Sequence, residues 1–118
     1  MWKADSEGIR APECFNFATD VLDRWASERS GSVGLWWVNG RNGEEKKFTF
    51  GDLARLSCQA ANVFAASGVR RGQTVLVMLP RVPQWWIAML GLIRLGAVPV
   101  PATLLLTDRD VAYRLQLA

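Results

Sequence analysis

Histidine is absent from the 118 residues, and cysteine occurs only at positions 14 and 58. Without histidine, catalysis of the Ser-His-Asp or Cys-His type is excluded, and so are most zinc sites. Cys14 and Cys58 form no CxxC motif, and two cysteines alone make a poor zinc site. Their spacing leaves a disulfide open, although nothing indicates a stapled secreted domain. We predict no metal site, and we expect Cys58 to be a small buried hydrophobic residue on a helix.

Several motifs of nucleotide-binding enzymes and hydrolases are missing as well. The sequence contains no GxGxxG after a strand, no GxxxxGK(S/T) loop and no GxSxG elbow. Its acidic residues offer no pair that would face a common cleft. We therefore predict no catalytic residue within this sequence.

Signals for export, for membrane insertion and for nucleic-acid binding are also weak. Residues 1–15 carry charges and lack an apolar core, so we expect no signal peptide. Between residues 85 and 106 the only charge is Arg94, and an arginine in the middle of a membrane span costs about 2.5–3.5 kcal/mol. Gly96, Pro99 and Pro101 indicate a helix, a turn and a strand rather than a span. The net charge is +3 and basic residues are scattered, so nucleic acid is not an expected partner.

The composition that remains is that of one folded globular domain. Half of the residues (50%) are hydrophobic and 21% are charged. Six tryptophans are many for this length, and four of them form the adjacent pairs 36–37 and 85–86. Because successive side chains of a strand point in opposite directions, we expect one tryptophan of a pair to face a surface that something else covers.

The first half of the chain predicts a helix, a hairpin and a second helix. A helix is expected from Asn16, as its N-cap, to about Ser30. Its apolar face would hold Phe17, Val21, Leu22 and Trp25, with Asp20, Asp23 and Arg24 turned away. Two Asn-Gly turn signals between residues 35–38 and 47–50 predict a β-hairpin. Thr49 would cap the next helix, which runs to about Ser67 with the apolar stripe Leu53, Leu56, Ala60, Val63 and Phe64.

The second half predicts a βαβ unit. The apolar run 74–79 is typical of a strand of a parallel sheet, buried on both faces. A helix over 82–95, closed by Gly96, and a strand from Val98 follow. Thr107 would open a last helix, with Asp110 completing a capping box, and this helix reaches Ala118 without a stop signal. The predicted fold class is α/β, an incomplete βαβ parallel sheet with a β-hairpin and flanking helices, because a complete parallel sheet needs more strands.

An ordered series of segments carries the most specific signal. They are FNFA (15–18), VLDRWA (21–26), LWWVNG (35–40), FTFGDL (48–53), ANVF (61–64), MLPRVPQWW (78–86), RLGAV (94–98), PAT (101–103) and YRLQ (113–116). Together they resemble the N-terminal region of medium-chain acyl-CoA synthetases, which belong to the adenylate-forming, AMP-binding superfamily. The resemblance implies that residues 1–118 are the N-terminal part of an AMP-binding domain, cut from a longer enzyme.

The resemblance also implies a two-step ligase. A carboxylate, such as that of a fatty acid, attacks the α-phosphate of Mg-ATP to give acyl-AMP, and the thiol of coenzyme A then displaces AMP. The parent enzyme would use ATP, Mg²⁺ and coenzyme A, whereas the piece alone is expected to bind none of them. The family's phosphate loop, its adenine and ribose motifs and its C-terminal lysine all lie beyond Ala118 in family order, so no catalytic residue is carried over.

One binding position is carried over. In the family, the loop after the strand equivalent to 98–100 approaches the nucleotide part of coenzyme A, and it corresponds to Thr103, Leu104 and Leu105. Medium-chain relatives have glutamine where this sequence has Leu105, so a side-chain hydrogen bond is lost. Ligands of open α/β sheets bind beyond the carboxyl ends of strands, which supports the same loop. The alternative interpretation makes Leu104 and Leu105 ordinary buried apolar residues.

Three residues before and within the 82–95 helix are weaker candidates. Arg81 follows a strand and lies near a helix start, where a phosphate can bind. A solvated or salt-bridged arginine is the simpler interpretation. Trp85 and Trp86 would line an acyl tunnel or, more simply, belong to the core.

Three functional readings stay open at this point. The chain is a piece of an acyl-CoA synthetase that is inactive alone, a non-catalytic binding or interaction module of the same fold, or a membrane-surface protein that uses residues 85–106. A phosphate loop downstream of Ala118 in the reading frame would favour the first, and a stop codon the second.

An unfinished sheet would also expose apolar surface, so self-association is expected. The expected location is the cytoplasm, with the mitochondrial matrix as the alternative.

Overall fold

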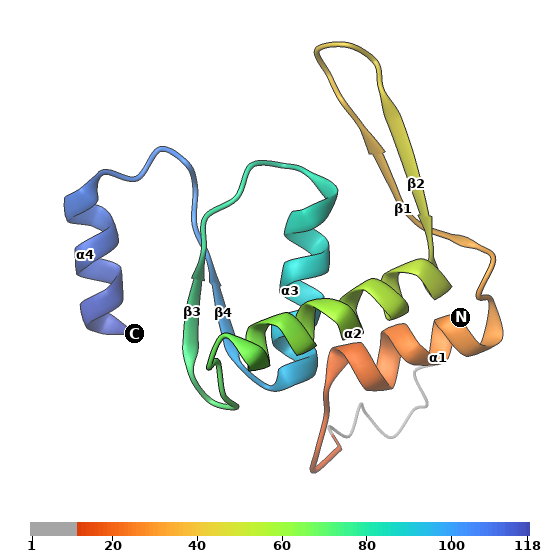
Figure 1. The fold of residues 1–118 in the computed structure, drawn as a ribbon, viewed down its shortest axis with the longest axis horizontal. Helices are drawn as coiled ribbons and strands as arrows, with labels where there is room; N and C mark the ends of the chain where they lie inside the picture. Colours follow the sequence, from red (N-terminus) through yellow and green to blue (C-terminus); the bar gives the residue numbers. More distant parts are fainter. Residues whose placement is uncertain (1–11) are drawn as a thin grey trace, which may run out of the picture.

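The computed structural model describes residues 12–118, so most of the segment in which a signal peptide was sought lies outside it. In chain order the elements are η1 (Ala18–Leu22), α1 (Asp23–Glu28), β1 (Val33–Val38), β2 (Glu45–Thr49), α2 (Phe50–Ala66), β3 (Thr74–Val77), α3 (Pro83–Leu95), β4 (Val98–Pro101) and α4 (Asp108–Leu117) (Figure 1). The predicted α/β class, with a hairpin, flanking helices and a βαβ unit, is confirmed.

The first helical segment begins as predicted, and among the residues predicted on its apolar face Phe17 is the exposed one. The side-chain oxygen of Asn16 accepts a hydrogen bond from the Ala18 N–H at 2.9 Å, which is the expected capping contact. Residues 18–22 then form a π-helical turn, η1, before α1. The wider turn moves side chains away from the 3.6-residue spacing on which the prediction depended. Ala18 and Leu22 are therefore buried, whereas Phe17 is 47% exposed, and its placement on the buried face was wrong.

The hairpin β1–β2 projects from the body of the molecule (Figure 1). Its strands pair antiparallel, with an irregularity between Val33 and Leu35. Along β1 the side chains alternate, so that Trp36 is 58% exposed while Trp37 is half-buried. The prediction that adjacent tryptophans face opposite ways is confirmed for this pair.

Helix α2 has the predicted start and a partly different buried stripe. The Thr49 hydroxyl accepts from the Asp52 N–H at 3.0 Å and the Asp52 carboxylate accepts from the Thr49 N–H at 3.0 Å, which completes a capping box. These hydrogen bonds from Thr49 hold the pKa of the Asp52 carboxyl below its ordinary value. The buried positions recur every four residues: Leu53, Ser57 and Ala61.

Two predictions about α2 are wrong. Val63 is 62% exposed and not part of the buried stripe. Cys58 is exposed rather than buried, and both cysteines are free thiols. The reason is a small rotation of the buried face towards the small residues Ser57 and Ala61, along which α3 approaches α2.

Strands β3 and β4 form the predicted parallel pair, with Thr74 opposite Val98 and Val77 opposite Pro101. Helix α3 connects them, with Pro83 at its first position and Gly96 in the left-handed conformation (φ 78°) at its C-cap. Val77, Leu92 and Ala97 form the buried centre of this unit. Strand β3 ends at Val77, two residues before the predicted end, and Leu79 is 39% exposed.

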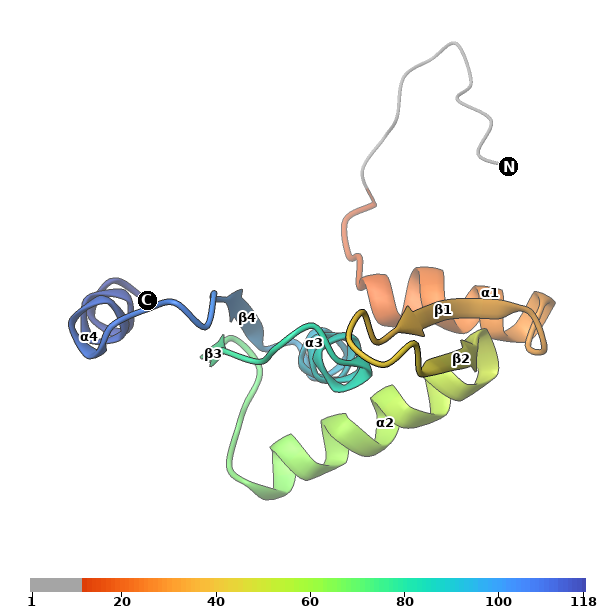
Figure 2. The same ribbon diagram turned by 90° about the horizontal axis from the view of Figure 1, so that it is seen from above.

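The elements lie in layers, which Figure 2 shows from above: α2 packs on α3, α3 packs on the β3–β4 pair, and α4 lies on the opposite side of the strands. The predicted capping box of α4 is present, since the Thr107 hydroxyl accepts from the Asp110 N–H at 3.3 Å and Asp110 accepts from the Thr107 N–H at 2.9 Å. Helix α4 itself contains no buried residue. None of the helices in residues 12–118 has the length and apolar character needed to cross a membrane.

Candidate functional site

A hollow of about 760 Å³ opens at the carboxyl ends of β3 and β4. The segment after β3 (79–81), two tryptophans at the start of α3 (Trp85 and Trp86) and the segment after β4 (101–104) line it. The short parallel pair brings these segments together, because both strands end at the same edge of the sheet. This edge is the place at which open α/β sheets bind ligands.

Aromatic side chains form one wall of the hollow. The rings of Trp85 and Trp86 lie 5.3 Å apart and meet edge to face at 76°. Both are half-buried, so each combines packing on the protein with an open ring surface. The lining contains one charged side chain, the exposed Arg81, and no acidic one. Such a wall suits a ligand with a flat apolar part and an anionic group.

The structure places two of the three predicted loop residues at this hollow. Thr103 and Leu104 belong to its lining, whereas Leu105 lies outside it. The Thr103 hydroxyl accepts a hydrogen bond from the Leu105 N–H at 3.2 Å, which fixes the loop locally. The alternative that both leucines are buried is wrong, because Leu104 is 52% and Leu105 is 89% exposed. Arg81, Trp85 and Trp86, predicted separately, come together with this loop.

Trp37 contacts a residue of the site, and the sequence analysis did not predict this. Its indole N–H donates to the main-chain oxygen of Arg81 at 2.7 Å, across 44 positions of sequence. Only the alternation of the Trp36–Trp37 pair signalled that one of the two would face inward. No sequence pattern indicated that its partner would be the main chain of Arg81.

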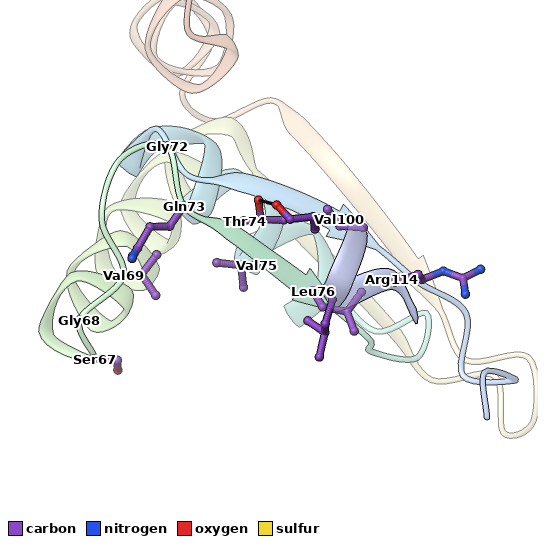
Figure 3. A pocket seen from close by; sticks show the side chains of 12 residues that line it. Ser67, Gly68, Val69, Gly72, Gln73, Thr74, Val75, Leu76, Val100 and Arg114 are labelled. Carbon is purple, nitrogen blue, oxygen red and sulfur yellow. Dashed lines mark hydrogen bonds between the residues drawn. The ribbon is translucent and has the colours of Figure 1, made fainter. Parts of the chain in front are cut away.

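A second hollow, of about 560 Å³, lies between β3 and α4 (Figure 3). Val75 and Leu76 of β3 and Arg114 of α4 are among its lining residues. The Arg114 guanidinium donates to the main-chain oxygen of Asp110 at 3.3 Å within its own helix. The Thr74 hydroxyl donates to the main-chain oxygen of Ala118 at 3.5 Å across the hollow. We assign no chemistry to it, since its polar groups already serve internal contacts.

An ion pair joins the three helices α1, α2 and α3. The guanidinium of Arg94 on α3 donates to the two carboxylate oxygens of Asp23 at 2.6 and 2.7 Å and to the Ser57 hydroxyl at 3.1 and 3.2 Å. The hydrogen bonds from Arg94 hold the pKa of the Asp23 carboxyl below its ordinary value, and Asp23 in turn raises the pKa of Arg94. The prediction that Asp23 faces away from the packed side was wrong, because charge alone does not show a partner 71 residues away.

Within residues 12–118 no group of three or more Cys, Asp or Glu side chains is placed to hold a metal ion.

Comparison with known proteins identifies the family. The model of the AMP-binding enzyme family matches residues 22–118. The chain is 49% identical over 113 residues to human mitochondrial acyl-coenzyme A synthetase ACSM2B, and the match covers 91% of this chain and 19% of that protein. It is 45% identical over 111 residues to human mitochondrial ACSM3, covering 89% of this chain and 19% of that one. The chain belongs to the AMP-binding enzyme family, and the predicted resemblance to acyl-CoA synthetases is confirmed.

Solved structures show the same fold. An acyl-CoA synthetase of Brucella canis superimposes with a TM-score of 0.80 at 26% identity, over 86% of this chain and 18% of that one. The N-terminal subdomain of Klebsiella oxytoca NpsA superimposes with a TM-score of 0.76 at 24% identity, over 87% of this chain and 25% of that one. The chain thus spans about a fifth of the length of the curated relatives it matches.

Proposed function

We propose that these residues are the N-terminal part of the AMP-binding domain of an acyl-CoA synthetase. The observation that carries the proposal is the 49% identity, over 91% of the chain, to a protein named as an acyl-coenzyme A synthetase. The reaction joins a carboxylic acid to coenzyme A. The carboxylate attacks the α-phosphate of ATP to give acyl-AMP and pyrophosphate, and the thiol of coenzyme A then displaces AMP.

The experiment that tests this function uses the protein encoded by the reading frame extended beyond Ala118. Supplied with ATP, Mg²⁺, coenzyme A and a series of fatty and aromatic acids, it is expected to release AMP and pyrophosphate and to form an acyl thioester. If no acid in the series gives a thioester while a known acyl-CoA synthetase does so in the same assay, the proposal is wrong.

The 118 residues alone are expected to form no acyl-AMP. Transfer at the α-phosphate needs positioned cations and backbone donors around the phosphates. The sequence contains no phosphate-binding loop that would supply them. The measurement is pyrophosphate release from ATP and a fatty acid, against a blank without protein. Release above that blank from a clean preparation would contradict the expectation.

Within the enzyme, we propose that the loop Thr103, Leu104 and Leu105, at the hollow beyond the ends of β3 and β4, contacts coenzyme A. Thr103 and Leu104 face the hollow, and Leu105 is the most exposed of the three. An exposed leucine offers only packing and backbone contact, so the glutamine of medium-chain relatives would add a hydrogen bond at this position.

Leu105→Gln is therefore expected to lower the KM for coenzyme A about two- to tenfold, the effect of one net hydrogen bond. The KM for ATP should not change. Val63→Gln on α2 is the matched control, because Val63 is also exposed (62%) and does not line the hollow. An unchanged KM for coenzyme A in Leu105→Gln would remove this loop from the coenzyme A site.

A non-catalytic interaction module of the same fold is the second candidate function. The observation that favours it is exposed apolar surface, since Tyr113, Leu115 and Leu117 of α4 are each at least 60% exposed. In the enzyme, other parts of the domain would cover this surface.

The names of the human relatives place those proteins in mitochondria, which favours the mitochondrial alternative over the cytoplasm.

The isolated chain is accordingly expected to self-associate or to form a loosely packed state. The β3–β4 pair has unpaired edges, and α4 buries no residue. Size-exclusion chromatography with light scattering, combined with binding of a dye to exposed apolar surface, measures this. A sharp monomer peak without dye binding and with cooperative thermal unfolding would instead show that these residues complete their own core.

A further inference from the structure

The hairpin β1–β2 is attached to the candidate site by a hydrogen bond from one side chain. Most of the hairpin projects from the body, as Figure 1 shows. At Trp37, however, the indole N–H reaches the Arg81 oxygen at 2.7 Å. Trp37 does not itself line the hollow, whereas the side chain and neighbours of Arg81 do. Trp37, which lies outside the hollow, thus holds the main chain of Arg81, which lines it.

The segment that receives this hydrogen bond has little other support. Val82 is the N-cap of α3 and provides no side-chain capping contact, and Pro83 has no N–H to donate. The local turn rests on two backbone bonds, from the Val82 N–H to the Pro80 oxygen at 2.8 Å and from the Trp85 N–H to the Val82 oxygen at 2.9 Å. The Arg81 carbonyl belongs to the same turn, and its hydrogen bond comes from Trp37 of the hairpin. Its position sets where Arg81 and Pro80 stand at the rim.

We propose that Trp37 is a positioning residue for this hollow: it fixes the segment 80–82 and so determines the affinity for the ligand without touching it. The proposal rests on the function proposed above for the identity of the ligand, coenzyme A. The neighbouring Trp36 has no such role. Its indole N–H donates to Glu45 at 3.1 Å within the hairpin, and its ring stacks under Lys47, whose ammonium lies 4.0 Å from the ring centroid.

The two tryptophans offer a matched pair of variants. Trp37→Phe keeps a large aromatic side chain and removes the donor to Arg81, and Trp36→Phe removes a donor that serves only the hairpin. Hydrogen exchange at the amides of Val82 and Trp85 is measured on the longer protein that carries these residues, because the isolated chain is expected to be loosely packed. We expect faster exchange at both amides in Trp37→Phe and no change in Trp36→Phe. Exchange in the body of α2 should be the same in both, which separates a local effect from a general loss of stability.

The kinetics of the same two variants are then measured with ATP, coenzyme A and an acid substrate. Trp37→Phe is expected to raise the KM for coenzyme A about three- to tenfold, as loss of one hydrogen bond implies, with kcat within about twofold of wild type. Trp36→Phe should change neither. Unaltered exchange at Val82 overturns the proposal, and so does faster exchange with an unaltered KM. If the wild-type enzyme forms no thioester, the proposed function fails, while exchange at Val82 still decides whether Trp37 holds the segment.

Discussion

Valine in place of Gly91 is expected to lower the free energy of unfolding by about 3 kcal/mol or to abolish cooperative unfolding altogether. Gly91 lies on α3 where it crosses α2, and a Cβ atom at this position would stand 2.6 Å from the Ala60 Cβ and 3.1 Å from the Ala61 N. The second of these neighbours is backbone, so the strain cannot be relieved by a change of rotamer. The two helices would have to separate, and this contact is the most extensive between any two elements of the described residues. Urea denaturation of the longer protein that carries these residues, followed by circular dichroism, measures the loss.

Gly31→Val is the matched control, because a Cβ atom at Gly31 meets nothing within 4 Å and the residue lies outside the helices. It should change the free energy of unfolding by no more than about 0.5 kcal/mol. Valine is intrinsically the better helix former of the two residues, so helix propensity does not explain a loss at position 91. Equal midpoints for the two variants would mean that α2 and α3 do not pack closely in solution.

The boundaries of several helices could be predicted from residues that are close together in the sequence. Thr49 was predicted to cap α2, and Thr107 with Asp110 was predicted to form a capping box. In both helices a hydroxyl and a carboxylate three residues apart satisfy each other's backbone donors. Gly96 marked the end of α3 because its left-handed backbone conformation (φ 78°) is one that glycine readily adopts. These are interactions between residues close in sequence, which spacing alone can show.

The failures share a different physical origin. Which face of a helix is buried depends on the neighbour that it meets, and Phe17, Val63 and Cys58 are exposed although their spacing or chemistry suggested burial. At Gly91 and Ala61 the opposite holds: small residues are buried because two helix backbones approach closely there. Hydrophobicity predicts that a helix has a buried side, but close packing of small residues decides its direction.

The candidate site shows the same division. Family resemblance indicated the loop 103–105, and the general rule for parallel strands indicated the edge of the sheet, so Thr103 and Leu104 at the hollow were predictable. The joining of Arg81, Trp85 and Trp86 with that loop required the register of β3 against β4. The hydrogen bond from Trp37 required, in addition, the direction in which the hairpin leaves the body. No pattern within a single element carries either kind of information.

The second large effect is expected from Arg94→Met, which should lower the free energy of unfolding by about 2–3 kcal/mol. Methionine keeps most of the length of the side chain and removes all four hydrogen bonds to Asp23 and Ser57. Removing one partner of a buried pair usually costs about 3–5 kcal/mol, and the lower figure reflects a pair in which Arg94 is 14% but Asp23 39% exposed to solvent. The loss has a specific cause: an unpaired carboxylate between α1 and α3.

Arg24→Met is the control for Arg94→Met, because the Arg24–Glu28 pair has side chains that are 73% and 52% exposed and should contribute less than about 0.5 kcal/mol. The pH dependence gives an independent check. Since the folded-state pKa of Asp23 lies below its unfolded value, the stability that the pair contributes is present above the unfolded pKa of about 3.9 and is lost as the pH falls through the folded pKa. Unfolding curves of wild type and Arg94→Met should therefore differ most at pH 6–7 and converge in acid. A difference that stays constant down to the lowest pH would show that Arg94 stabilises the helices through packing of its aliphatic part, and not through the carboxylate of Asp23.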